Sequence, residues 1–444
     1  MVLSQSFSDA ESGVAEELTC RAQIARHAAI QTKTNAKERG TTMKLTMKHI
    51  ACLSVGGLAI ALAGWTSAAQ AEEPIKVGFA AALSGWLAAY DEEPHKAAVL
   101  KIEEINKAGG LLGRQIEYNV IDTKTDPTVA ASAAASLVDW GANVLIVPPD
   151  YDMGSPAALV AQNAGTIAIS TGASDPKMGA QGVGPYVFTA HTAGQAAGIV
   201  MAEYGYKKLN MKTAYMLEDV SMEATKSSCA GFVAAWNAAG GTLLGRDTFQ
   251  KEDPSIAAQI TRIKGLQEAP EFIFMCSSLP EGPSAVRQIR AAGIDVPILS
   301  DTGMSGNFWL NGVPGLKDFY VPTLMSINGG DPRSEINTFL EKYKARWGAL
   351  PTTEFSVLGY CAIEQWARAV EKAESVESDA VLAVMNQFRD EPITCGPTSY
   401  TDQIHVQVSR PQLIMKVEDG AFRPQELYRN EFVPDLKLLL RSGQ

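Results

Sequence analysis

Cysteine is scarce in this chain, which has six cysteines among 444 residues. A small scaffold stapled by disulfides carries many more, so the fold must depend on a hydrophobic core. No two cysteines form a Cys-x-x-Cys pair, and His95, His191 and His405 are scattered along the sequence. We therefore expect neither a metal site nor a thioredoxin-like redox site, and we expect no cofactor.

Positive charge is also in short supply. There are 38 Lys and Arg against 49 Asp and Glu, which gives a formal net charge of −11 at pH 7. A nucleic-acid partner requires a basic face that neutralises phosphates, so the composition argues against such a partner.

The signature motifs of common enzymes are missing. The sequence has no Gly-x-Ser-x-Gly elbow, no Gly-Lys dipeptide for a phosphate loop and no His-Glu-x-x-His. Ser174-Asp175-Pro176-Lys177 matches Ser-x-x-Lys, but the other β-lactamase motifs are absent and Pro176 disfavours a helical Ser/Lys face. The sequence therefore predicts a protein that is not an enzyme.

Long hydrophobic runs are missing as well. The apolar run at 50–65 is shorter than the ~20 residues that cross a membrane. It follows a basic stretch that opens at Met43 and precedes Ala69-Gln70-Ala71, a small-x-small cleavage pattern. This order is typical of a secretory signal peptide, here residues 43–71, with a membrane anchor as the alternative. We hypothesise that residues 1–42 are a start-site extension and that the mature chain, 72–444, is exported to the periplasm.

The mature chain alternates strand-like and helix-like segments. The first are a strand at 75–80, a helix at 94–108 stopped by Gly109-Gly110, and a strand at 115–122. The alternation restarts after His191 and runs to a strand at 296–300. Helices at 334–347 and 355–372 and a hairpin at 413–423 close the chain. Repeated strand–helix units predict an α/β fold with two Rossmann-like lobes built on parallel sheets.

Polar loops follow the predicted strands. Ligands of open parallel sheets bind beyond the carboxyl ends of the strands, so these loops are candidates for a binding cleft. They are rich in Ser, Thr, Gly, Asp and aromatic residues, as a cleft for a small molecule is. The loops are 81–90, 148–155, 171–177, 218–222, 276–280 and 301–309.

Three motifs resemble a known family. They are Asn-x-x-Gly-Gly-x-x-Gly-Arg at 106–114, followed by a strand and Asp122; Ile-Ser-Thr-Gly-Ala-Ser-Asp-Pro at 169–176; and Arg-Gln-x-Arg-Ala-Ala-Gly at 287–293. Together they are similar to the type I periplasmic solute-binding proteins of branched-chain amino-acid ABC importers, such as the Leu/Ile/Val-binding proteins. The resemblance spans nearly all of 73–428.

The resemblance implies two lobes joined by three hinge strands, near 190–192, 321–324 and 393–397. Lobe 1 would comprise 74–190 plus 322–394, and lobe 2 would comprise 191–321 plus 395–430. Such a protein captures a small polar molecule, an amino acid or a related compound, and delivers it to a membrane permease; we expect a monomer. A ligand-sensing receptor of the same fold is the alternative, and an exported hydrolase is a third reading.

Carried over by motif, the resemblance also implies ligand contacts. Family members use a first-loop aromatic, a hydroxyl and backbone amides in the second motif, and an acidic residue that pairs with the ligand ammonium. Two positions depart from the pattern: the serines expected after Val147 are replaced by Asp-Tyr-Asp-Met, and a tyrosine expected near Met222 is missing. The predicted ligand-binding residues are Trp86, Tyr90, Asp150, Tyr151, Asp152, Ala173, Ser174, Met222, Ser278, Asp301 and Thr302.

Two pairs of residues leave alternatives open. Asp150 and Asp152 either cap the helix predicted near Pro156 or, beside Tyr151, favour a cationic or polyhydroxy ligand. The four cysteines of the mature chain allow three pairings. For Cys361 and Cys395 we weigh a bridge against buried free thiols.

Overall fold

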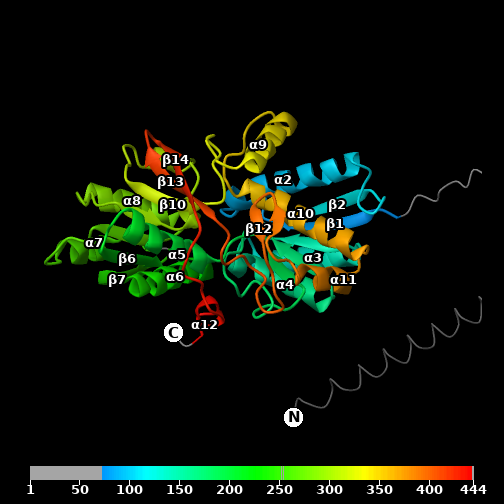
Figure 1. Ribbon diagram of the computed structural model, residues 1–444, viewed down its shortest axis with the longest axis horizontal. Helices are drawn as coiled ribbons and strands as arrows, with labels where there is room; N and C mark the ends of the chain where they lie inside the picture. The colour runs from blue at the N-terminus through cyan, green and yellow to red at the C-terminus, as the bar shows by residue number, and fades with distance from the viewer. Residues whose placement is uncertain (1–72, 252, 254, 443–444) are drawn as a thin grey trace, which may run out of the picture. The chain divides into compact units, whose positions relative to one another are not determined.

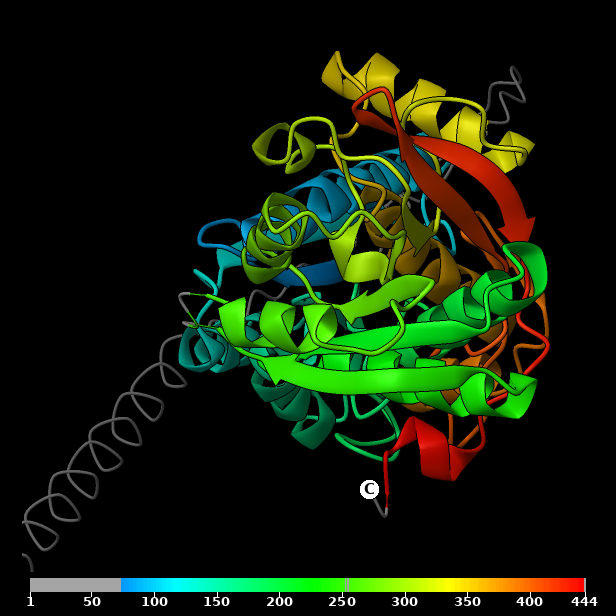
Figure 2. The same cartoon turned by 90° about the vertical axis from the view of Figure 1, so that its left-hand side faces the viewer.

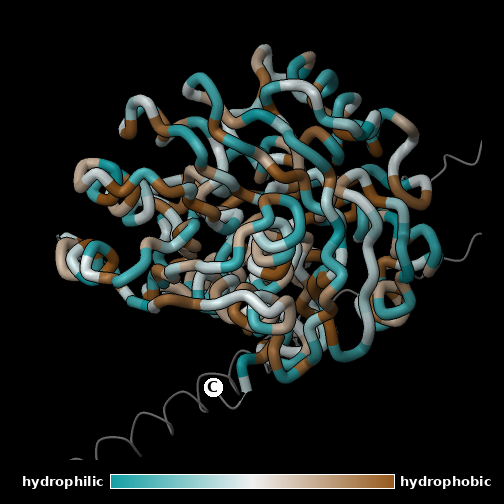
Figure 3. Tube along the Cα trace, turned by 60° about the vertical axis from the view of Figure 1, so that its left-hand side comes forward, coloured by the Kyte–Doolittle hydropathy of each residue, from teal (hydrophilic) through white to brown (hydrophobic). Residues whose placement is uncertain are grey.

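The computed structural model describes residues 73–251, 253 and 255–442. The predicted start-site extension and signal peptide lie outside the described residues. Within the described part, each helix is too short or too polar to span a bilayer. Hydrophobic and hydrophilic residues are interspersed along the tube in Figure 3, as expected for helices that each bury one face.

Lobe 1 is built on a five-stranded sheet in the order β2-β1-β3-β4-β5, with every pair of neighbours parallel. Parallel neighbours require crossover helices, which cover the sheet (Figure 1). The strands are β1 (Ile75–Ala81), β2 (Ile116–Asp122), β3 (Val144–Val147), β4 (Ile167–Ser170) and β5 (Val187–Thr189), and the helices are α2 (Ala88–Lys107), α3 (Pro127–Asp139) and α4 (Tyr151–Asn163).

Lobe 2 is built on a seven-stranded sheet in the order β14-β13-β10-β9-β8-β6-β7. Strands β6 to β10 are parallel, and the predicted closing hairpin joins them as antiparallel β13 and β14. Green β6 and β7 run across the front of Figure 2. The strands are β6 (Thr213–Asp219), β7 (Thr242–Phe249), β8 (Phe272–Cys276), β9 (Ile298–Ser300), β10 (Phe319–Thr323), β13 (Gln412–Glu418) and β14 (Ala421–Tyr428).

Helices and short turns complete lobe 2. Glycines let α5 and α6 approach closely, because a Cβ on Gly198 would lie 1.9 Å from the Ser228 carbonyl oxygen. The elements are α5 (Gly194–Glu203), the π-turn η1 (Tyr204–Lys208), α6 (Glu223–Ala239), α7 (Ala257–Lys264), α8 (Glu281–Ala291), the 3-10 turns η2 (Thr302–Met304) and η3 (Leu310–Gly312), and α12 (Leu436–Leu439).

Between β10 and β13 the chain returns to lobe 1. Helix α10 packs along α2, and a Cβ on Gly359 would lie 1.8 Å from the Pro94 carbonyl oxygen. The elements of this excursion are α9 (Ser334–Trp347), α10 (Ser356–Ala373), α11 (Ser378–Met385), β11 (Glu391–Ile393) and β12 (Gly396–Thr398). The predicted α/β class with two lobes on largely parallel sheets is therefore confirmed.

Two helices start earlier than the sequence indicated. Helix α2 begins at Ala88 rather than at Pro94, and α4 begins at Tyr151 rather than beside Pro156. Proline favours the first turn of a helix, so a proline near a helix start suggests a boundary there. Both prolines instead lie inside their helices, at the seventh position of α2 and the sixth of α4.

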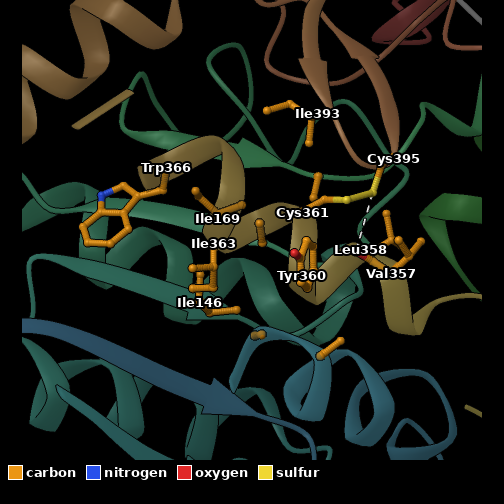
Figure 4. Close-up of a cluster of buried hydrophobic side chains, with 14 of the residues drawn as sticks. Ile146, Ile169, Val357, Leu358, Tyr360, Cys361, Ile363, Trp366, Ile393 and Cys395 are labelled. Carbon is orange, nitrogen blue, oxygen red and sulfur yellow. Dashed lines mark hydrogen bonds between the residues drawn. A yellow bond between two sulfur atoms is a disulfide. The ribbon is translucent and has the colours of Figure 1, made fainter. Parts of the chain in front are cut away.

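Two disulfides lock helices to neighbouring strands. Cys361 of α10 is bonded to Cys395 between β11 and β12, so the bridge hypothesis holds and the free-thiol alternative is wrong (Figure 4). Cys229 of α6 is bonded to Cys276 at the end of β8, a pair that the sequence left undecided. Ile393, Cys395 and Tyr400 belong to the same hydrophobic core as β1 and α10, so we propose that the third crossing follows Tyr400 rather than lying at 393–397. The disulfide to α10 explains why the hairpin stays with lobe 1.

Candidate functional site

The carboxyl ends of strands from both lobes face one cavity. Its atom-free space is about 620 Å³, including the part open to solvent. Eight of the eleven predicted site residues line it: Trp86, Tyr90, Asp150, Ser174, Met222, Ser278, Asp301 and Thr302. The loops selected from the sequence therefore meet in space.

Tyr90 joins the two lobes at the cavity. It lies on α2 of lobe 1, and its ring packs edge-to-face on Phe355 with the ring centres 5.2 Å apart. Its hydroxyl donates to the Gly303 carbonyl at 3.0 Å and accepts the Leu279 N–H at 3.2 Å, both in lobe 2. Tyr90 is thus both an aromatic wall and a contact that depends on the lobes being together.

Asp150 caps helix α4. Its side chain accepts the Met153 N–H at 3.0 Å, so the cap hypothesis is confirmed for this residue. Burial raises the pKa of the Asp150 carboxyl to about 7, and the charge of Asp152 adds to that rise. The same carboxyl lines the cavity, so capping and a contribution to the cavity's charge are compatible.

The other three predicted residues lie outside the cavity lining. The carboxylate of Asp152 accepts the N–H of Glu223, the first residue of α6, at 3.0 Å, and this bond links the lobes. Tyr151 is partly buried against the core of lobe 1. The Ala173 N–H donates to the Ser170 hydroxyl at 3.1 Å, so this backbone amide already has a partner.

The lobe 2 wall presents polar atoms without partners. Asp301 directly follows β9 and is 5% exposed, and its Oδ1 has no hydrogen-bond partner. Burial raises the pKa of the Asp301 carboxyl to about 8, since the ionised form loses its hydration. The hydroxyl of Thr302 is also buried without a partner. Buried polar groups are seldom left unpaired, so these atoms indicate where a bound molecule would make its polar contacts.

His191 and Phe355 are among the cavity residues that the sequence did not predict. His191 follows β5, and its Nδ1 lies 2.7 Å from the Thr192 carbonyl oxygen, while its Nε2 has no partner. Burial lowers the pKa of His191 to about 4, so the ring is neutral at pH 7. Its place after a strand is the signal that could have identified it as a cleft residue. Phe355, at the start of α10, gave no signal because it reaches the cavity through long-range packing.

A cluster of ion pairs bridges the lobes next to the cavity. Glu223 of α6 accepts from the Lys177 ammonium at 2.6 Å and from the Arg441 guanidinium. Arg441 also binds Asp175 of lobe 1 at 2.9 Å. Burial alone would raise the pKa of Glu223, but Lys177, Lys226 and Arg441 hold it at about 2. Among the described residues, no group of three or more His, Cys, Asp or Glu is placed to hold a metal ion.

Comparison with known proteins decides the family. Residues 74–421 match the periplasmic binding protein family. The chain belongs to this family. The predicted membership in the type I proteins related to Leu/Ile/Val-binding proteins is confirmed.

Relatives of this periplasmic binding protein cover most of both chains. The Leu/Ile/Val-binding protein BraC3 of Rhizobium johnstonii is 25% identical over 359 residues, 80% of this chain and 93% of its own. The leucine-, isoleucine-, valine-, threonine- and alanine-binding protein of Pseudomonas aeruginosa is 24% identical over 328 residues, 74% of this chain and 86% of its own. The crystal structure of LivJ from Streptococcus pneumoniae in complex with isoleucine superposes with a TM-score of 0.69 at 25% identity, covering 80% of this chain and all of LivJ.

Proposed function

We propose that the mature chain captures a small polar molecule, an amino acid or a related compound, between its two lobes and delivers it to the permease of an ABC importer. The cavity carries this proposal, because both lobes line it and unpartnered polar atoms face it. The relatives support it, since their names describe amino-acid binding. A thermal-shift screen of residues 72–444 against amino acids, amines, amides and polyols tests it, because a ligand at 100 times Kd stabilises by ~2.7 kcal/mol. A screen in which no compound raises the melting temperature would contradict it.

We propose export to the periplasm with cleavage after Ala71, and action as a monomer. Two disulfides suit an oxidising compartment such as the periplasm. N-terminal sequencing of the protein from its native host tests the cleavage. Peptides from residues 5–39 in the exported protein would contradict both the cleavage and the start at Met43.

The three crossings between the lobes are proposed as the hinge. They lie between β5 and α5, between β10 and α9, and between β12 and β13. Three parallel connections confine motion to a few backbone torsions, as in hinge closure around ligands. We expect small-angle scattering to give a smaller radius of gyration with the best compound of the screen than without it. Identical curves at saturation would contradict hinge closure.

Tyr90→Phe is expected to weaken ligand binding about 30-fold. The variant keeps the aromatic wall but removes two hydrogen bonds that exist only when the lobes are together, each worth about 1 kcal/mol. Calorimetric titration with the best compound of the screen measures the loss. Tyr118→Phe, a partly exposed position on β2, is the matched control and should leave affinity unchanged. Equal affinities for Tyr90→Phe and the control would show that the Tyr90 hydroxyl does not contribute to closure of the lobes.

A further inference from the structure

The charged side chains that line the cavity are all acidic. Asp150 contributes a carboxyl from lobe 1 and Asp301 contributes one from lobe 2. Among the described residues that line the cavity, none is a Lys or an Arg. His191 is neutral at pH 7, because burial lowers its pKa to about 4. The cavity therefore offers two acidic groups and no positively charged side chain to balance them.

Among the described residues, no Lys or Arg pairs with Asp301. Tyr90 of α2 and Ser228 of α6 face it as neutral groups, and Asp219 at the end of β6 faces it as a second acid. The backbone N–H groups of Ser277 and Gly303 lower the pKa of Asp301, yet its Oδ1 has no partner. A buried carboxylate is strongly unfavourable unless a positive charge accompanies it.

Three helices that begin at the cavity already have a partner for one N–H of the first turn. The start of α4 is capped by the side chain of Asp150, and the first N–H of α5, from Gly194, donates to the Ser174 carbonyl at 2.7 Å. The first N–H of α6 donates to the Asp152 carboxylate. A helix N-terminus is the usual place for an anion without a cationic side chain. These three N–H groups are therefore not free to bind the carboxylate of a ligand.

Aromatic rings complete the lining. Trp86, Tyr90 and Phe355 line the cavity with the two acids. Ring faces attract ammonium groups, and the effect grows when the cation is desolvated. The Lys251 ammonium lies 5.9 Å from the Trp86 ring centre, so Tyr90 and Phe355 are the lining rings without a lysine recorded over them among the described residues.

We infer that the cavity takes an organic amine, a molecule with a protonated ammonium group and no carboxylate, rather than a zwitterionic α-amino acid. The inference rests on the proposed capture function and names its ligand class. The ammonium contacts Asp301 and the aromatic rings, and Asp150, when it is ionised, repels a carboxylate.

Amine binding is linked to pH. Burial raises the pKa of Asp301 to about 8 and that of Asp150 to about 7, so both bind protons in the empty protein near neutral pH. An ammonium favours the ionised carboxylates, so below these pKa values binding must release protons. Around Asp150 the titratable neighbour is Asp152, whose charge acts in the same direction. Affinity for an amine therefore falls as the pH is lowered from 8.5 to 6.

Matched compounds test the ligand class by calorimetric titration of the mature chain at pH 8.5 and 6. Three sets of graded size are used: ethylamine, alanine and propanoate; 3-methylbutylamine, leucine and 4-methylpentanoate; 2-phenylethylamine, phenylalanine and 3-phenylpropanoate. In at least one set the amine should bind ten times more tightly than its amino acid, and the acid should not bind. The affinity of that amine should fall at least tenfold between pH 8.5 and pH 6. The binding enthalpy should also depend on the ionisation heat of the buffer, because the buffer takes up the released protons.

Asp301→Asn tests the residue. It should lower amine affinity at least tenfold and reduce the pH dependence, whereas Asp139→Asn on the exposed end of α3 should change neither. An amino acid or acid that binds more tightly than its amine, or no amine binding at millimolar concentration, overturns the inference. If scattering shows that another compound closes the lobes, the capture function still stands. If no compound of the screen closes them, the capture function is contradicted as well.

Discussion

Replacing both Cys361 and Cys395 by alanine is expected to lower the free energy of unfolding by about 4 kcal/mol. The disulfide closes a segment whose ends are 34 residues apart, and a loop of this length restricts the unfolded chain strongly. It also fixes the β11–β12 hairpin to α10, directly before the third crossing. The loss should therefore be accompanied by weaker closure around a ligand.

Urea unfolding followed by circular dichroism measures this loss. The Cys229→Ala/Cys276→Ala variant is the matched comparison, since its pair spans 47 residues and should show a loss of similar size. Unlike the first variant, it should not weaken closure around a ligand, because the Cys229–Cys276 pair joins two elements within lobe 2. An unfolding midpoint that is the same with and without reducing agent would contradict both disulfides.

Gly198→Ala is expected to destabilise lobe 2 by at least about 3 kcal/mol and to abolish ligand binding. Helix propensity alone predicts the opposite sign, since alanine is favoured over glycine inside a helix by about 1 kcal/mol. The new Cβ would lie 1.9 Å from the Ser228 carbonyl oxygen and 2.7 Å from the Phe232 nitrogen. Both atoms are backbone atoms of α6, so the whole helix must move away. The start of α6 lines the cavity, and its displacement disrupts the site.

A matched substitution isolates the packing effect. Gly312 is exposed, and a Cβ there would meet only Arg287 at an ordinary 3.5 Å. Gly312→Ala should therefore change stability by less than about 0.5 kcal/mol. Thermal unfolding of the two variants compares them directly. A Gly198→Ala variant that is as stable as the wild type would show that α5 and α6 are not in close contact.

Local patterns were sufficient to predict the lobes and most of the cavity. Strand and helix periods, with Gly109-Gly110 as a stop signal, identified the alternation, and the rule that ligands bind at strand ends selected the right loops. Tyr90 and Asp301 lie in these loops, and the family resemblance singled them out as ligand contacts. Proline was a poorer guide, since Pro94 and Pro156 lie inside helices.

Features set by distant partners escaped prediction. Asp152 lies two residues after Asp150, which lines the cavity. Its carboxylate instead accepts the N–H of Glu223, 71 residues away in the other lobe. Phe355 reaches the cavity because α10 packs on α2, which no local period reveals. The Cys229–Cys276 pair depends on α6 lying against β8, and spacing alone cannot choose it among three pairings.

A crystal structure of residues 72–444 with the tightest-binding compound of the screen tests the central claim most directly, because it locates the ligand relative to both lobes. The account predicts one molecule in the cavity, in contact with Trp86 and Tyr90 of lobe 1 and with Asp301 of lobe 2. The Tyr90 hydroxyl should remain bonded to Gly303 across the cleft. A compound bound elsewhere, or held by one lobe while the other stays apart, would contradict the proposal that this protein captures its ligand between the lobes.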